Sequence, residues 1–111
     1  MAASTEATWS PYVTPDRDRV VVKPHGELDL ATVPELAEQV DDLEKVGFKH
    51  MVLDLQEVTF IDSTAIHFMI QRAKTENVEY EIRAGNEVVQ HAFDLAGVTS
   101  LFQPRQRNGT E

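Results

Sequence analysis

From residue 20 onward, the sequence predicts an α/β domain in which strands and helices alternate along the chain. Three segments, 20–22, 51–55 and 78–84, have the β-branched, apolar or alternating composition of strands. Each is followed by a segment whose apolar residues recur every three or four positions, as in a helix packed on one side. The middle strand is apolar at adjacent positions, which is typical of a strand buried on both faces of a parallel or mixed sheet.

Two strands are expected in the N-terminal part of the chain. Trp9, Tyr12 and Val13 indicate a short edge strand, although two nearby prolines each remove a donor from the hydrogen-bond ladder. Residues 19–23 are rich in valine and predict a firmer strand, which ends in a turn at Pro24.

The first helix has signals for both of its ends. Thr32 and Glu35 have the spacing of a capping box, and Pro34 is tolerated in a first turn because its missing N–H would have no partner there. Apolar residues then recur with helical spacing over residues 33–46. Gly47 follows at the position where a left-handed residue commonly ends a helix.

The buried strand at residues 51–55 leads into a second helix. We expect residues 56–61 to be a short connection and the helix to run from Ser63 to about Thr75. Its expected buried face consists of Ala65, Ile66, Met69, Ile70 and Ala73.

The last third of the chain predicts a strand and a third helix. Residues 78–84 alternate between apolar and charged side chains, as in a strand with one face in water. Asn86 is a candidate N-cap for a helix that ends at Gly97, and residues 98–102 form a final apolar segment.

Composition limits the classes of function. A chain of 111 residues fits one domain, which we place at residues 9–103, with flexible ends at 1–8 and 104–111. Its net charge of −9 argues against direct binding of nucleic acid and favours a partner with a basic surface, although the charge also serves solubility. No apolar stretch is long enough to span a membrane, and there is no cysteine. We expect a cytoplasmic protein that does not associate with membranes.

The candidate functional site is the junction at Asp62, Ser63 and Thr64, where a helix follows a strand. The first N–H groups of a helix have no partner within it, so this end favours negative charge, and a hydroxyl placed there suits phosphorylation. The structural alternative is that Asp62 or Ser63 only caps the helix. Glu27 and Asp29 should lie on the same rim if the neighbouring strands are parallel, with Asp29 near Ser63 or simply within its own turn.

Other chemistries have weaker support. A metal site would need Glu27, Asp29 and Asp62 from separate loops, so we assign none. Ser63 and His67 lie four residues apart, but no glycine flanks the serine as in a hydrolase turn, so we assign no catalytic triad. There is also no glycine-rich phosphate loop. We therefore expect no catalytic residue and no cofactor.

Three blocks of sequence occur in an order that resembles the anti-sigma factor antagonists, which are single-domain bacterial STAS proteins. The blocks are GELDLAT at residues 26–32, VLDL with VTFIDST within 52–64, and FDLAGV at 93–98. The resemblance spans roughly residues 20–102. It implies a STAS-like mixed β-sheet with helices packed mainly on one side.

The resemblance also implies residue roles. In that family the first hydroxyl after the Asp of the second block is phosphorylated, so Ser63 is the expected site and Thr64 the lesser candidate. Asp29 and Asp62 match the acidic residues beside the phosphorylation site. The residues expected to bind the partner are Asp29, Asp62, Ser63, Thr64 and His67. Two partners are implied. The first is an anti-sigma factor that is itself a serine kinase and that releases a sigma factor when the antagonist binds it. The second is a phosphatase that removes the phosphate. The implied protein is a monomer or dimer.

Two positions depart from the family pattern. Family members usually carry Gly directly after the two hydroxyls and a small or aliphatic residue two positions later, whereas this chain has Ala65 and His67. These changes concern the approach of a kinase and the choice of partner. The alternative function is therefore a constitutive STAS scaffold in a larger signalling assembly, with Ser63 only a helix cap. We also expect the closing C-terminal helix to be short or absent.

Overall fold

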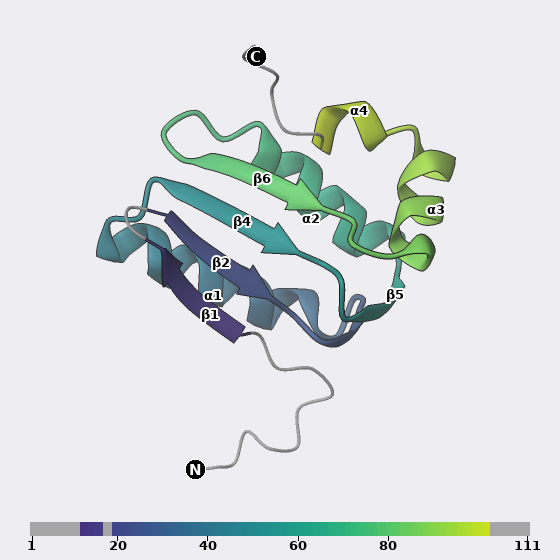
Figure 1. The fold of residues 1–111 in the computed structure, drawn as a ribbon, viewed down its shortest axis with the longest axis horizontal. Helices are drawn as coiled ribbons and strands as arrows, with labels where there is room; N and C mark the ends of the chain where they lie inside the picture. Colours follow the sequence, from purple (N-terminus) through teal and green to yellow (C-terminus); the bar gives the residue numbers. More distant parts are fainter. Residues whose placement is uncertain (1–11, 17–18, 103–111) are drawn as a thin grey trace.

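The computed structural model describes residues 12–16 and 19–102, with side chains described from residue 19 (Figure 1). Its strands are β1 (Tyr12–Asp16), β2 (Arg19–Lys23), β3 (Gly26–Leu28), β4 (His50–Asp54), β5 (Val58–Ile61) and β6 (Glu79–Arg83). Its helices are α1 (Val33–Val46), α2 (Ser63–Ala73), α3 (Glu87–Ala96) and α4 (Thr99–Phe102).

The main sheet is mixed, as predicted. Its order is β1-β2-β4-β6, with β1 antiparallel to β2 and the remaining pairs parallel. The parallel pairs require crossovers, and α1 and α2 provide them on one side of the sheet, behind it in Figure 1. α3 and α4 lie beyond the end of β6. The α/β class and the placement of helices mainly on one side are confirmed.

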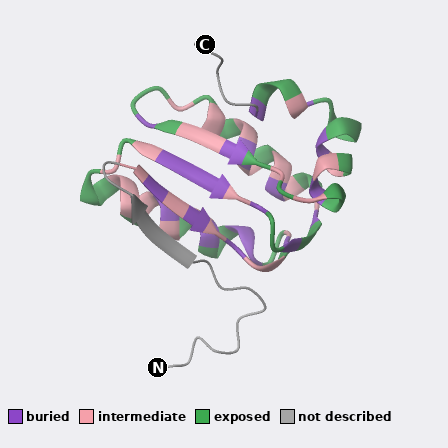
Figure 2. Cartoon of the chain, in the orientation of Figure 1, coloured by how far each residue is buried: buried purple, intermediate pink, exposed green. Residues whose placement is uncertain are grey.

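β4 is the central parallel strand and is buried on both faces. Met51, Val52 and Leu53 have no exposed surface, which confirms the interpretation of adjacent apolar residues. Met51 and Leu53 belong to the core beneath the helices. In Figure 2, buried residues fill most of β4, whereas much of α3 is coloured as exposed.

A second, two-stranded parallel sheet was missed by the sequence analysis. β3 pairs with β5, so residues 26–28 are not only a turn and residues 58–61 are not only a connection. Both strands are too short for a period of two to be visible, and β5 has two exposed residues between two buried ones. The register also shifts at Gly26. This pair brings the end of β3 next to the start of α2.

Most predicted helix ends are confirmed. Gly47 ends α1 and Gly97 ends α3, each in the left-handed conformation, and the Asn86 side chain accepts a hydrogen bond from the Val89 N–H. The capping box is wrong, because Thr32 has near-helical backbone angles and its side chain makes no cap hydrogen bond.

The predicted ends of the domain are partly described. The edge strand is present as β1, which contains Tyr12 and Val13, whereas Trp9 lies outside the described residues. α4 is four residues long and follows α3 closely. The segments expected to be flexible, 1–8 and 104–111, also lie outside the described residues.

A polar cluster fastens α1, α2 and β6 together. Arg72 on α2 forms ion pairs with Asp41 at 2.8 Å and Glu44 at 3.2 Å, both on α1. The hydroxyl of Tyr80 on β6 donates to the same Glu44 carboxylate. Burial, together with this hydrogen bond, raises the pKa of Tyr80 above its ordinary value.

No helix in the described part of the chain has the length and apolarity to cross a membrane.

Gly85 should tolerate a side chain less well than Gly97. Its φ is +76°, and a Cβ atom there would lie 2.7 Å from the backbone of Gln56. Gly97 has a similar φ of +74° but open space around it. We expect Gly85→Ala to lower the free energy of unfolding by about 3 kcal/mol and Gly97→Ala by about 1 kcal/mol, measured by urea denaturation. Equal losses would contradict the close approach of residues 56 and 85.

Candidate functional site

Ser63 is the first residue of α2 and is exposed to solvent. The preceding residue, Asp62, is the N-cap, with an extended backbone and a side chain that accepts a hydrogen bond from the Ala65 N–H at 3.0 Å. Capping is therefore the role of Asp62. The hydroxyl of Ser63 is left at the start of a rigid helix with no capping task.

The second carboxylate oxygen of Asp62 reaches a different part of the chain. Oδ2 accepts a hydrogen bond from the Leu30 N–H at 3.2 Å, and the Asp62 N–H donates to the Leu28 carbonyl at 3.2 Å. Asp62 thus joins the start of α2 to the turn formed by residues 29–32. This connection spans 32 positions of sequence.

The 29–32 turn is held by its own side chains. The Asp29 carboxylate accepts hydrogen bonds from the N–H groups of Ala31 at 3.0 Å and Thr32 at 3.2 Å. The buried Thr32 hydroxyl donates to the Glu27 carbonyl at 2.8 Å and accepts from the Asp29 N–H at 3.0 Å. The role expected of Thr32 at the helix start is therefore replaced by a role within the turn.

The expectation that Asp29 and Ser63 share one rim is confirmed, because β3 and β5 are parallel neighbours. The carboxylate of Asp29 nevertheless serves its own turn, and Asp62 makes the connection between the two segments. Among the described residues, no group of three His, Asp or Glu side chains is placed to hold a metal ion. Glu27, Asp29 and Asp62 do not form such a group.

The remaining predicted residues lie along α2. Thr64 is partly buried, whereas Ser63, His67 and Gln71 are exposed and form one solvent-facing stripe. Ala65, which replaces the usual glycine, has no exposed surface. Its methyl group therefore faces the core, and of the two departures only His67 changes the surface.

The segments that surround Ser63 are acidic. Residues 26–44, 50–71 and 84–102 contain no Lys or Arg. Since α1 and α2 run against the parallel strands, Lys45 and Arg72 in their last turns lie at the end opposite Ser63, together with Asp41 and Glu44. Lys23 and Arg83 stand at the carboxyl ends of β2 and β6. The rim around Ser63 is therefore rich in carboxylates, a local concentration that net charge alone did not reveal.

Two exposed apolar side chains beside Ser63 were missed. Leu30 in the 29–32 turn is 73% exposed, and Phe60 at the end of β5 is 48% exposed. The only sequence signal was that both residues fall within the family blocks, since Phe60 lay in a segment assigned to a connection. We call Asp29, Leu30, Phe60, Asp62, Ser63, Thr64 and His67 the Ser63 surface.

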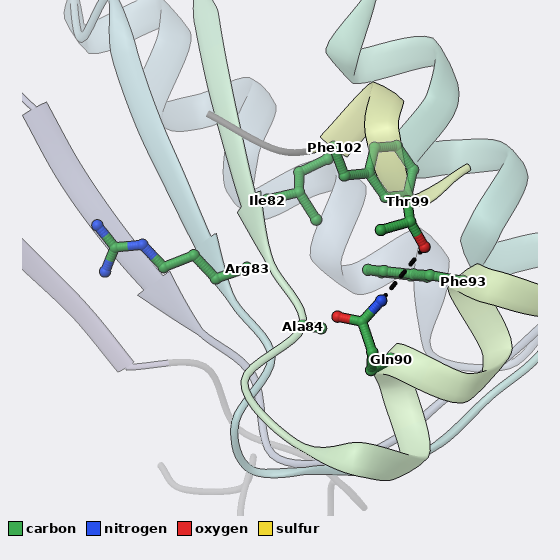
Figure 3. Close-up of a pocket in the computed structure, with 7 residues that line it drawn as sticks. All are labelled: Ile82, Arg83, Ala84, Gln90, Phe93, Thr99 and Phe102. Atoms are coloured by element: carbon green, nitrogen blue, oxygen red, sulfur yellow. Dashed lines mark hydrogen bonds between the residues drawn. The ribbon is translucent and has the colours of Figure 1, made fainter. Parts of the chain in front are cut away.

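A small cavity of about 150 Å³ lies elsewhere, between the end of β6 and the helices α3 and α4 (Figure 3). Ile82, Ala84, Phe93 and Phe102 supply its apolar walls. Gln90 donates a hydrogen bond to Thr99 at 3.2 Å across one side, and the Arg83 side chain points away from the cavity. None of the predicted site residues lines it.

Comparisons with known proteins agree with this fold. A family model for the STAS domain matches residues 11–109. The anti-sigma-B factor antagonist of Staphylococcus aureus is 30% identical over 93 residues, which cover 81% of this chain and 84% of the relative. That of Staphylococcus epidermidis is 31% identical over the same length. The chain therefore belongs to the STAS domain family of anti-sigma factor antagonists.

Two solved structures support the fold. An anti-sigma factor antagonist from Mycobacterium paratuberculosis has a TM-score of 0.75 at 21% identity, covering 87% of this chain and 86% of its own. The anti-sigma factor antagonist SpoIIAA in its unphosphorylated form has a TM-score of 0.69 at 16% identity, covering 88% and 90%. Because both sequence identities are low, these two matches show only that the fold is similar.

Substitution of Asp62 should separate its two hydrogen bonds. Asp62→Ala removes both acceptors and should lower the free energy of unfolding by about 1 to 2 kcal/mol. Asp62→Asn keeps one oxygen for the helix cap but offers an N–H₂ group toward the Leu30 N–H, so its loss should be smaller. Amide exchange at Leu30 should accelerate in both variants. Unchanged exchange at Leu30 would contradict the connection between α2 and the 29–32 turn.

Proposed function

We propose that this protein is a phosphorylation-controlled anti-sigma factor antagonist of the cytoplasm. The unphosphorylated chain binds an anti-sigma factor that is a serine kinase, and the sigma factor is released. Phosphorylation of Ser63 ends this binding, and a phosphatase restores it. The single observation that carries the proposal is that Ser63 is an exposed hydroxyl at a helix start whose capping is already done by Asp62.

The chemical step requires little from this chain. The Ser63 Oγ attacks the γ-phosphorus of ATP held by the kinase, and the bond to the bridging oxygen of ADP breaks. The hydroxyl proton passes to a base on the kinase, and ADP leaves. The antagonist supplies the nucleophile and the docking surface, binds no cofactor of its own and is not an enzyme in this scheme.

The added phosphate affects the free protein and the complex in opposite directions. It brings a charge of about −1.5 to −2 to a rim that already holds Asp29 and Asp62. The helix start stabilises a negative group by only about 0.3 to 1 kcal/mol. An uncompensated charge buried in an interface costs about 3 to 5 kcal/mol. The cost in the complex is larger, so the phosphorylated form keeps its fold and loses its partner.

The remainder of the Ser63 surface indicates what the partner presents. Leu30 and Phe60 offer apolar contact beside the serine, and carboxylates surround them without a Lys or Arg nearby in sequence. The matching surface on the anti-sigma factor is an apolar depression with a basic rim. Such electrostatic complementarity mainly raises the rate of association and makes it sensitive to salt.

The buried position of Ala65 weighs against the constitutive scaffold. A kinase that approaches α2 does not meet the Ala65 methyl group, because it has no exposed surface. The scaffold account also needed Ser63 as the helix cap, a role that belongs to Asp62. Size-exclusion chromatography separates the two functions, since the switch requires a monomer or dimer and the scaffold a large homo-oligomer.

Substitution of Ser63 tests the proposed modification. On mixing with its anti-sigma kinase and ATP, the protein should gain one phosphate, detected by intact mass. Ser63→Ala should gain none and still bind the kinase, whereas Ser63→Glu should bind poorly. Thr64→Val is the matched control and should be modified like the natural protein. Undiminished phosphorylation of Ser63→Ala would show that the site lies elsewhere.

Substitution of Phe60 tests the proposed docking surface. Loss of a central aromatic contact typically costs about 2 kcal/mol or more, so Phe60→Ser should weaken binding of the anti-sigma factor at least ~30-fold by calorimetry. Val46→Ser is the matched control, because Val46 is 75% exposed at the opposite end of α1. The Val46→Ser variant should bind the anti-sigma factor with unchanged affinity. Equal effects of the two substitutions would argue that the partner binds another face.

A further inference from the structure

The exposed stripe of α2 places an imidazole one turn after the candidate phosphorylation site. Ser63 and His67 are both exposed and are separated by four residues. Four residues correspond to about 6 Å along the helix axis, and positions four apart lie on the same face. The next exposed residue of the stripe, Gln71, is uncharged.

The direction of helical side chains brings the imidazole toward the serine. Each Cα–Cβ bond is tilted toward the helix N-terminus, so a side chain covers the turn that precedes its own Cα. By this rule, the side chain of His67 is directed toward the turn that begins at Ser63. A phosphate extends outward from the serine oxygen and brings three acceptor oxygens to the same side of the helix.

Other charged groups around α2 are already engaged or carry the wrong sign. On α1, Asp41 and Glu44 bind Arg72 at the far end of α2. On β6, Glu81 pairs with Arg83 at 2.7 Å. α4 has no ionisable side chain.

The same applies at the Ser63 end. The nearest acidic groups, Asp62 and Asp29, accept hydrogen bonds from backbone N–H groups, and Glu35 and Glu38 on the first half of α1 are negative. Lys74 lies eleven residues beyond Ser63, about 16 Å along the helix direction. His67 is left as the cationic candidate for a group on Ser63.

We propose that His67 binds a phosphate on Ser63 within the same chain. This inference rests on the proposed function for the origin of the phosphate. The protonated imidazole donates to a phosphate oxygen, which favours the charged imidazole and the doubly charged phosphate together. The imidazolium offsets part of the phosphate charge, and the site stays net negative. His67 sets how much of the phosphate charge a partner or phosphatase meets.

The test uses the full chain with phosphoserine incorporated at position 63 during translation, so that no kinase is needed. The four histidines are titrated by NMR with and without the phosphate. The pKa of His67 should rise by roughly 0.5 unit or more on phosphorylation. His91, exposed on α3, is an internal control and should not move. An equal shift at both histidines would reduce the effect to general electrostatics and overturn the proposal.

Variants supply a second measurement on the same phosphorylated protein. His67→Gln should raise the second pKa of the phosphate, followed by phosphorus NMR, and His67→Lys should lower it again because the cation is restored. His91→Gln should leave it unchanged. A phosphate pKa that ignores both substitutions at position 67 would also overturn the proposal.

These results are independent of the proposed function. If the anti-sigma kinase leaves Ser63 unmodified while His67 responds to the installed phosphate, the function assigned to Ser63 fails and the contact stands. If the kinase modifies Ser63 and His67 does not respond, the switch stands and the contact fails.

Discussion

The two oxygens of one carboxylate, that of Asp62, hold together the segments on which the site is built. One accepts from the Ala65 N–H and defines where α2 begins, and the other accepts from the Leu30 N–H and fixes the 29–32 turn against that beginning. These two bonds add to the β3–β5 pairing and to the bond from the Asp62 N–H to the Leu28 carbonyl, which already bring the two segments together. With them, Leu30 and Ser63 are presented together on one rigid rim.

The parallel topology places this rim and gives it its charge. Helices that return from one parallel strand to the next begin at the carboxyl ends of the strands and finish at the amino ends. On α1, Glu35 in the first turn is thereby placed at the Ser63 end and Lys45 in the last turn at the opposite end. A phosphate added to Ser63 enters the acidic end. No rearrangement of the fold is needed for it to disfavour a partner that matches the unmodified rim.

Much of the fold was predictable because its signals are local. Asn86, Gly47 and Gly97 mark helix ends through their own backbone or side-chain chemistry, and β4 shows its burial directly in its apolar run. The β3–β5 pair was not predictable, since strands of three and four residues carry no readable period. The misassigned capping box has the same origin. Thr32 has the right spacing, but its hydroxyl is used by a turn that depends on distant pairing.

Some features of the candidate site were likewise predictable from the sequence, and others were not. The placement of Ser63 at a helix start followed from the strand-to-helix junction, and the residue roles came from the family resemblance. The division of capping and modification between Asp62 and Ser63, and the exposure of Leu30 and Phe60, depend on three-dimensional contacts that no single segment encodes.

We propose the rim joined by Asp62 as the surface on which an anti-sigma factor docks. Chemical-shift mapping of the labelled protein, titrated with its anti-sigma factor, measures this directly. The largest changes should fall on residues 29–32 and 60–67. Changes confined to the face of β2, β4 and β6 that the helices leave uncovered, with residues 60–67 unmoved, would contradict it.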